Sequence, residues 1–214
     1  MNVTIIGAGN MGRGIGTRLL SGGHSVTLVD REPESATALA EQLASSAKNG
    51  AMVQIAAFGS PIEDQVVILA VPFGATSSII EQYGSKLAGK IVVDISNPLN
   101  ITYDGLAVPA GTSAAEEIAK EVPNGTKVIK AFNTIFAGTL EKGEVDNKPL
   151  DILIAGDDAE AKSKVAELIK DGGLRPIDTG PLSRARQLEG IGFLHITLQK
   201  TLATNWKSTV KILG

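Results

Sequence analysis

Three glycines give this sequence its first chemical signal. Gly7, Gly9 and Gly12 follow the apolar segment 2–6 and precede a segment with a helical pattern. In the spacing G-x-G-x-x-G, the first glycine permits a tight turn, the second lets the backbone approach a pyrophosphate, and the third lets the helix pack closely on the strand. The N–H groups and the positive dipole at the helix start then favour a diphosphate. The turn, which also holds Asn10 and Met11, therefore predicts a dinucleotide site.

A charged pair follows the next expected strand, at residues 25–29. Asp30 lies about twenty residues after the glycine turn, where a carboxylate that binds the adenosine ribose belongs. A carboxylate about 4 Å from a 2′-phosphate costs about 4 kcal/mol at an effective dielectric constant near 20. Asp30 taken alone therefore favours NAD. Arg31 can offset that cost by a bidentate grip on the phosphate or by stacking on adenine.

Three more loops end expected strands and carry side chains suited to a cofactor. In an open parallel sheet, ligands bind outside the carboxyl ends of the strands. In one loop Pro72 removes a backbone donor and Phe73 offers an apolar surface, while the polar side chains of the other two can meet a ribose or a nicotinamide. We expect all three at the cofactor. Their residues are Val71, Pro72, Phe73, Asn97, Pro98, Asn133 and Thr134.

Side chains that could donate a proton are few, since the chain has two histidines, two tyrosines and no cysteine. His24 precedes a strand and so lies at the amino edge of the sheet, and Tyr83 falls late in a helix. His195 is expected to pack on the apolar face of the last helix, and Lys130 to be buried along its stem or paired with a carboxylate. Tyr103 remains a possible donor.

No catalytic triad, metal-ligand cluster or paired carboxylates stand out in the sequence. We therefore expect no dedicated catalytic side chain and no metal. Carbonyl reduction requires a proton donor near the developing alkoxide. Hydride transfer between two stacked rings depends mainly on geometry, so the shortage of donors favours that chemistry.

The elements that must position these residues alternate between strands and helices. Segments 66–71 and 91–95 are apolar on both faces, as strands of a helix-covered parallel sheet are. The alternation predicts an α/β Rossmann fold, doubly wound around a mostly parallel sheet. Strands are expected at 2–6, 25–29, 52–56, 66–71, 91–95, 127–132, 151–155 and 175–178, and helices at 13–21, 33–46, 75–87, 113–121 and 159–170.

The pattern changes at about Ser183. Apolar residues then recur at helical spacing as far as Trp206, which predicts one terminal helix of about thirty residues. We divide the chain into a dinucleotide-binding domain, 1–182, and a C-terminal helix, 183–214. A stripe of that length needs a cover, either within the chain or, as we expect, in a homodimer.

Composition restricts the remaining possibilities. Hydrophobic residues make up 43% of the chain and charged residues 20%, as in globular proteins. The net charge of −3 has no basic excess, which excludes nucleic acid as an expected partner. No apolar run approaches the roughly 20 residues that span a bilayer, and the first strand begins at residue 2. We expect a cytoplasmic protein with no membrane partner.

Three longer segments carry a family resemblance, and they are 89–98, 130–134 and 172–182. With them the chain resembles the NADP-dependent reductases of the 8-hydroxy-5-deazaflavin coenzyme F420, and it is similar to the reductase domain of six-transmembrane ferric reductases. The resemblance implies a dimeric Rossmann protein working by direct hydride transfer. It places the nicotinamide near Asn97-Pro98 and Asn133–Ala137, and so adds Ala137 to the expected cofactor contacts. It places an electron-accepting ring under Pro181–Arg186.

Two departures from the family bear on specificity. The archaeal members tend to have histidine at the position of Asn133, so deazaflavin specificity does not carry over. They also tend to have a serine-arginine pair where this chain has Asp30-Arg31. We expect NADP, with NAD possible because of Asp30. Arg184 and Arg186 suit either an anionic acceptor tail or a solvated helix face.

We therefore expect an NAD(P)H-dependent oxidoreductase that transfers hydride between a nicotinamide and a small-molecule electron acceptor, flavin-like or deazaflavin-like. Two alternatives remain. One is a small carbonyl or imine reductase, for which Tyr103 would supply the proton. The other is a nicotinamide-binding sensor without enzymatic activity.

Overall fold

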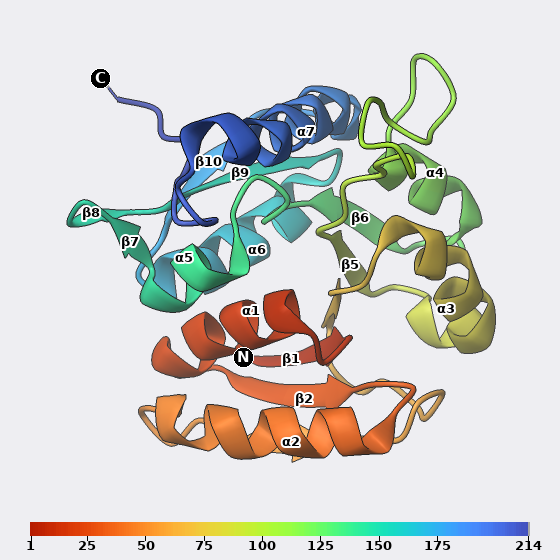
Figure 1. Cartoon of the computed structure of the whole chain (residues 1–214). Helices are drawn as coiled ribbons and strands as arrows, with labels where there is room; N and C mark the ends of the chain where they lie inside the picture. Colours follow the sequence, from red (N-terminus) through yellow and green to blue (C-terminus); the bar gives the residue numbers. More distant parts are fainter. Residues whose placement is uncertain (214) are drawn as a thin grey trace.

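The computed structural model describes residues 1–213 and shows one large sheet covered by helices (Figure 1). Its eight strands run in the order β10-β9-β6-β5-β4-β1-β2-β3. The pairings from β6 to β3 are parallel, whereas β9 pairs antiparallel with β6 and parallel with β10. The bounds are β1 (Asn2–Ile6), β2 (Ser25–Val29), β3 (Val53–Ile55), β4 (Val66–Leu69), β5 (Ile91–Asp94), β6 (Lys127–Lys130), β9 (Asp151–Gly156) and β10 (Arg175–Asp178). The predicted doubly wound, mostly parallel Rossmann fold is confirmed.

Two helical layers explain why the strands are apolar on both sides. In β4, Val66 and Ile68 join one core cluster, while Val67 and Leu69 join the other, because successive side chains of a strand point to opposite faces. The first cluster contains residues of α1, α2, α5 and α6, and the second contains residues of α3, α4 and the start of α7. The helices are α1 (Asn10–Ser21), α2 (Pro33–Leu43), α3 (Thr76–Tyr83), α4 (Ala114–Glu121), α5 (Ala137–Lys142), α6 (Ala159–Asp171) and α7 (Ala185–Leu202).

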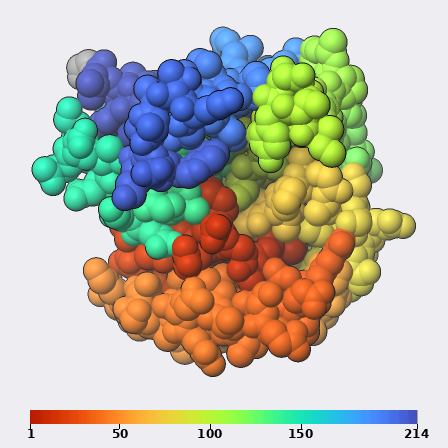
Figure 2. All heavy atoms as spheres, in the orientation of Figure 1, coloured from red at the N-terminus to blue at the C-terminus, as the bar shows by residue number. Residues whose placement is uncertain are grey.

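The order of the strands fixes where a ligand can bind. β1 lies between β4 and β2, so the strand order reverses at β1. In sheets of this type, ligands bind beyond the carboxyl ends of the strands at such a switch point. The loops after β1, β2, β4, β5 and β6 all leave the same edge of the sheet, because these strands are parallel. In Figure 2 the surface is hollowed where the red N-terminal part meets the blue C-terminal part and the yellow-green middle of the chain.

The predicted terminal helix of about thirty residues is wrong, since α7 ends at Leu202. Ala203 takes a left-handed backbone conformation with φ 52°, which stops the helix. Thr204 donates a hydrogen bond to the Gln199 side chain and fixes the turn. Trp206 therefore lies in an irregular tail and not on the helix, and residue 214 lies outside the described residues. The division at 182/183 stays a prediction.

Three of the α-helices and strands, α5, β7 (Glu144–Val145) and β8 (Lys148–Pro149), were not predicted from the sequence. α5 has six residues, and the two strands of the β7–β8 hairpin are shorter still. Segments of this length hold too few apolar positions for a period to be read. None of the helices within residues 1–213 combines the length and apolar composition that crossing a bilayer requires.

Candidate functional site

The glycine turn has the geometry that its spacing predicted. Gly7 has φ 113°, and a Cβ there would overlap the carbonyl of Ala70, so this residue must be glycine. A Cβ at Gly12 would overlap the carbonyl of Gly7, which shows how closely α1 approaches the turn. At Gly9, by contrast, no heavy atom outside its immediate chain neighbours lies within 4 Å of a Cβ built there. The second glycine therefore leaves free the space that a ligand would need.

The start of α1 fits an anionic group. Its N-cap residue, Gly9, makes no side-chain capping bond, and its first turn contains no acidic residue among those described. α4 and α6 are different, since Ser113 and Asp158 cap them and glutamates occupy their first turns. The N–H groups that begin α1 remain available together with the positive end of the helix dipole. This cradle matches a diphosphate.

The two residues of the charged pair after β2, Asp30 and Arg31, make different contacts. Asp30 Oδ2 accepts a hydrogen bond of 2.7 Å from the Ala8 N–H, and Oδ1 accepts one of 3.0 Å from the Glu32 N–H. The carboxylate thus holds the glycine turn. Arg31 is exposed, lies 5.3 Å over the Phe58 ring and donates a hydrogen bond to the Ser78 hydroxyl.

The loop after β4 lies directly beside the turn. A Cβ on Gly7 would come within 2.9 Å of Val71 Cγ1, so Val71 packs against the glycine. Pro72 and Phe73 continue this wall, with Phe73 beginning a short 3-10 turn that leads into α3. Val71, Pro72 and Phe73 therefore lie at the edge of the sheet where the sequence placed them.

An amide pair joins the loops after β5 and β6. Asn97 Nδ2 donates to the Asn133 carbonyl at 2.7 Å, and Asn133 Nδ2 donates to Asn97 Oδ1 and to the Leu188 carbonyl, both at 2.9 Å. Each amide donates to a backbone carbonyl, which fixes its orientation. Asn133 Oδ1 is buried and has no hydrogen-bond partner within the described residues. Gly192 of α7 packs so closely on Asn97 that a side chain there would overlap it.

A cavity of about 350 Å³ lies at these loops. It brings together Met11 from the start of α1, the Asn97–Asn133 pair, and Gly192 from α7. Its lining is mostly apolar or aromatic. The full set is Met11, Ile95, Asn97, Leu99, Tyr103, Phe132, Asn133, Thr134, Ile135, Phe136, Ala137, Gly192, His195, Ile196 and Trp206.

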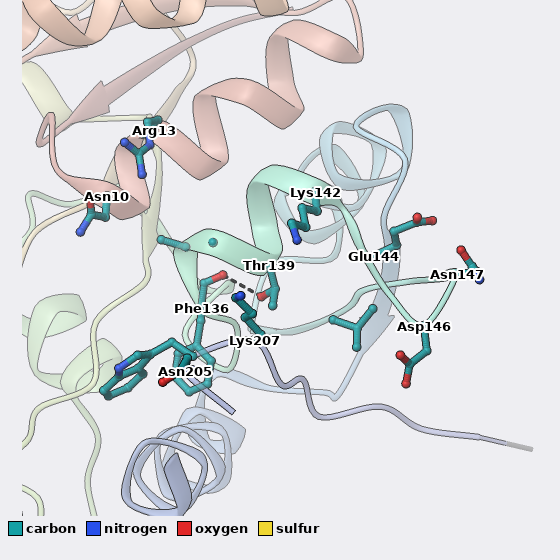
Figure 3. A pocket seen from close by; sticks show the side chains of 14 residues that line it. Asn10, Arg13, Phe136, Thr139, Lys142, Glu144, Asp146, Asn147, Asn205 and Lys207 are labelled. Carbon is teal, nitrogen blue, oxygen red and sulfur yellow. Dashed lines mark hydrogen bonds between the residues drawn. The ribbon is translucent and has the colours of Figure 1, made fainter. Parts of the chain in front are cut away.

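A larger cavity of about 1020 Å³ lies beside it (Figure 3). The two share Phe136, Ala137 and Trp206. The larger cavity also reaches Asn10, and further along it carries charges of both signs, from Lys142 and Lys207 to Glu144 and Asp146. Its walls come from α1, α5, the β7–β8 hairpin and the tail after α7.

His195 lines the smaller cavity but is fully engaged. Its Nδ1 is 3.2 Å from the Thr134 carbonyl and its Nε2 is 2.8 Å from the Ser208 hydroxyl, while its ring centroid is 4.2 Å from that of Phe136. Burial lowers the pKa of His195, which favours the neutral ring. With Nδ1 donating to Thr134, Nε2 accepts from Ser208. His195 is therefore a packed and satisfied histidine, as the sequence predicted.

The other candidate proton donors lie apart from the cavity, except Tyr103. His24 precedes β2 and contacts the amino terminus and Asp171, and Tyr83 accepts a hydrogen bond from the Gly59 N–H at 3.1 Å. Tyr103 lines the cavity and is 61% exposed. Residues 1–213 contain no cluster of side chains that could hold a metal ion.

Lys130 forms a buried charge cluster that sequence reasoning identified in part. Its ammonium contacts Asp94 at 2.7 Å and Glu189 at 2.8 Å, and all three side chains are completely buried. Glu189, on α7, also accepts from the Ala114 N–H at the start of α4, and burial raises its pKa. The partner of Lys130 on α7 could not be predicted, because the contact depends on how α7 folds back over β6.

The expected place of an acceptor ring, under Pro181–Arg186, is not where the cavity lies. α7 contributes Gly192, His195 and Ile196 to the cavity instead. Leu182 packs in the core, and Arg186 forms an ion pair with Glu116 on α4. Arg186 therefore ties α7 to α4.

Comparisons with known proteins identify the family of the chain. The family model for NADP oxidoreductase, coenzyme F420-dependent, matches residues 2–98. The F420-dependent NADP reductase of Methanothermobacter marburgensis is 32% identical over 209 residues, which cover 92% of each chain. The solved structure of a putative F420-dependent NADP reductase from Arthrobacter sp. FB24 has a TM-score of 0.82 at 30% identity and covers 99% of both chains.

A longer relative matches this chain over only part of its own length. The metalloreductase STEAP3 of Rattus norvegicus is 36% identical over 189 residues, or 88% of this chain, and the chain spans 36% of that protein's length. The parallel sheet, the open glycine turn and the adjoining cavity define a dinucleotide-binding oxidoreductase of the Rossmann class. The chain belongs to the family of coenzyme F420-dependent NADP oxidoreductases and is an NAD(P)-dependent oxidoreductase.

Proposed function

We propose that this enzyme transfers hydride directly between NADPH and the ring of a flavin-like or deazaflavin-like acceptor. One observation carries the proposal. The cavity of about 350 Å³ adjoins the glycine turn at Met11 and is lined mainly by apolar and aromatic side chains. Small-molecule sites of this type occupy roughly 300–1,000 Å³. The names of the relatives, which specify coenzyme F420 and NADP, support the same class of acceptor.

The residues of the chain would bind and orient the cofactor. The diphosphate would lie over Gly9 and the first N–H groups of α1, where a side chain is absent and no cap competes. The nicotinamide, which supplies the hydride when bound, would lie beside Asn97 and Asn133. The unpaired Asn133 Oδ1 complements an N–H group of the nicotinamide amide, and Thr134 and Ala137 border the same space.

We infer that NADP is preferred to NAD. Both oxygens of Asp30 accept backbone hydrogen bonds within its own loop and the glycine turn, so this carboxylate is turned from the ribose. Arg31 remains exposed at the same strand end, beside the Ser78 hydroxyl. A guanidinium with a neighbouring hydroxyl suits a 2′-phosphate.

The neutral, satisfied state of His195 supports direct transfer, since this histidine has no free proton for a substrate. The rate of hydride transfer would then depend mainly on how the two rings are positioned. Two stacked rings held at near-contact distance need no dedicated acid for the hydride step.

Anaerobic mixing of the protein with NADPH and either FMN or an 8-hydroxy-5-deazaflavin tests the function. The expected result is loss of the nicotinamide absorbance that requires both protein and acceptor. If neither acceptor causes that loss, the proposed reaction is wrong.

We also propose that two copies associate through α7. Leu194, Leu198 and Leu202 are 57%, 37% and 51% exposed and follow one another at four-residue intervals. Side chains at this spacing share one face of a helix. In a two-fold dimer the same face of each copy would meet the other, which suits a self-complementary stripe of leucines.

A further inference from the structure

The one tryptophan of the chain lies in an exposed position that packing does not explain. Trp206 is 52% exposed, although it borders both cavities of the site. Exposing half of an indole forgoes much of the stabilisation that its burial would give. Its ring meets Phe136 edge-on, with the centroids 5.0 Å apart and the planes at 88°. The indole thus contacts Phe136, while about half of the Trp206 side chain is exposed to solvent.

The backbone that presents Trp206 is strained and firmly held. Ala203, Asn205 and Trp206 all have left-handed conformations, with φ of 52°, 50° and 61°. Such residues cost on the order of 1 kcal/mol each and persist where the surroundings enforce them. The enforcement here comes from Ser208, whose hydroxyl meets His195 Nε2 and Gln199 Nε2, both at 2.8 Å.

A second anchor holds the tail further on. Asp151 at the start of β9 accepts hydrogen bonds from the Lys211 ammonium at 2.7 Å and from the Ile212 N–H at 2.8 Å. The tail is therefore fixed on both sides of Trp206 in sequence, by α7 before it and by β9 after it.

A second aromatic side chain reaches the same cavity from a different loop. Tyr103 is 61% exposed, has φ 58°, and lines the cavity of about 350 Å³ together with Trp206. Its loop is closed by a pair of hydrogen bonds, from Asn100 Nδ2 to Asp104 at 2.6 Å and from the Asp104 N–H to Asn100 at 3.1 Å. Two exposed aromatic rings on separate, braced, left-handed segments thus border one cavity.

We propose that Trp206 and Tyr103 are the aromatic walls that bind the flat ring of the electron acceptor, with Trp206 contributing most. The inference rests on the proposed function and adds the residues that bind the acceptor. It is a fused heteroaromatic ring, recognised by its apolar face. Phe136 supports the indole, and Phe136 is itself packed against His195.

The polar groups of the cavity point to the same class. The side-chain amides of Asn97 and Asn133 donate to each other's residue and to the Leu188 carbonyl, and both nitrogens of His195 are engaged. Asn133 Oδ1, unpaired within residues 1–213, is assigned to the nicotinamide in the proposed function. These groups offer few free donors or acceptors to a substrate carbonyl or amine. Offset or edge-on contact between rings is the interaction that remains.

The test measures binding apart from turnover. The dissociation constants of FMN and of an 8-hydroxy-5-deazaflavin are determined by equilibrium dialysis, and that of NADP⁺ by calorimetry. Trp206→Ala is compared with Trp206→Phe, and Tyr103→Ala with Tyr103→Phe. Leu213→Ala is the matched control, because Leu213 is an exposed tail residue that borders neither cavity.

Loss of an aromatic contact is expected to weaken acceptor binding about two- to tenfold in each alanine variant. The phenylalanine variants and Leu213→Ala should bind the acceptor within about twofold of the unaltered protein, and NADP⁺ affinity should stay constant throughout. Acceptor binding that is unchanged in both alanine variants would overturn the inference. So would failure of the unaltered protein to bind either ring.

The proposed reaction and the proposed aromatic walls can be refuted independently of each other. If both alanine variants reduce the acceptor as well as the unaltered protein does, the proposed aromatic walls are refuted and the proposed reaction stands. If the rings bind through Trp206 but NADPH is not oxidised, the reaction is refuted and the binding site stands. If Tyr103→Phe binds the ring normally but loses turnover, its hydroxyl is a proton donor, which contradicts a purely stacking role.

Discussion

At the scale of single residues, the proposed preference for NADP rests on two neighbouring side chains with different contacts. Asp30 holds the Ala8 and Glu32 N–H groups, and Arg31 stays exposed. The order Asp-Arg was visible in the sequence. The hydrogen bonds that hold Asp30 to the glycine turn, and so leave Arg31 exposed, were not visible there.

Replacing Arg31 by alanine should therefore affect the two cofactors unequally. A charge-assisted hydrogen bond contributes about 1.5–3 kcal/mol, so KM for NADPH should rise about tenfold to a hundredfold while that for NADH stays nearly constant. Steady-state kinetics with both cofactors measures this. Arg186→Ala, an exposed arginine paired with Glu116, is the control. Equal changes with both cofactors would show that Arg31 does not meet the 2′-phosphate.

The buried charge cluster makes a prediction about stability. Lys130→Met would leave Asp94 and Glu189 buried without their cation, and breaking a buried ion pair costs about 3–5 kcal/mol. Lys127→Met on the same strand is the matched control. The Lys127 side chain is 47% exposed and pairs with Asp158 at 3.3 Å, so its loss should cost less than about 1 kcal/mol. Urea unfolding measures both values, and similar losses would argue against the cluster as an anchor of α7.

Part of the site could be predicted from residues alone. The glycine turn was identified because its spacing is local and each glycine has a steric reason. Asn97 and Asn133 were placed at the ends of neighbouring strands, but their mutual hydrogen bonds were not foreseen. Glu189 and Trp206 were missed as site residues, because their positions follow from the path of α7 and the tail in three dimensions.

At the scale of elements, the eight strands of the sheet were predictable because each is short and most are apolar on both faces. The end of α7 was not. The apolar spacing continues past Leu202, and the helix stops where Thr204 and Ser208 bond to Gln199. These hydrogen bonds between the tail and the helix end α7 in spite of the apolar spacing. They depend on the three-dimensional path of the tail, so the spacing alone could not predict them.

The anchor of the tail should show in the pH dependence of stability. Burial opposes ionisation of Asp151, but hydrogen bonds from Arg175, Lys211 and the Ile212 N–H hold its pKa at about 2. An unfolded aspartate titrates near 3.9, so the stabilisation is present above about pH 4 and is lost as the pH falls towards 2. It amounts to about 2 kcal/mol.

Asp151→Asn should therefore lower the free energy of unfolding at neutral pH by about 2 kcal/mol and lose less stability between about pH 4 and pH 2. Thermal unfolding at neutral pH and from about pH 4 to pH 2 measures both differences. Asp146→Asn, in the turn of the β7–β8 hairpin, is the control and should follow the unaltered protein. A curve for Asp151→Asn parallel to that of the unaltered protein would contradict the assignment.

At the scale of the whole molecule, the exposed face of α7 predicts a dimer. Leu198 is the middle of the three exposed leucines, so Leu198→Glu would place a charge at the centre of the contact. The protein should sediment as a dimer and the variant as a monomer, with unchanged helix content. Glu160→Gln, on an exposed site of α6, should remain dimeric. A monomer before substitution would refute the interface.

The arrangement as a whole places a cofactor cradle, an amide pair and an aromatic cavity along one edge of the sheet. The central claim of the proposed function is that hydride passes directly from the nicotinamide to the acceptor ring. The direct measurement is a single turnover with NADPH carrying deuterium at the transferred position of C4 and an 8-hydroxy-5-deazaflavin acceptor, analysed by mass spectrometry. The deuterium should be recovered on the ring carbon of the reduced acceptor, with none lost to solvent. Reduced acceptor that carries only solvent hydrogen, or no reduced acceptor at all, would contradict the account.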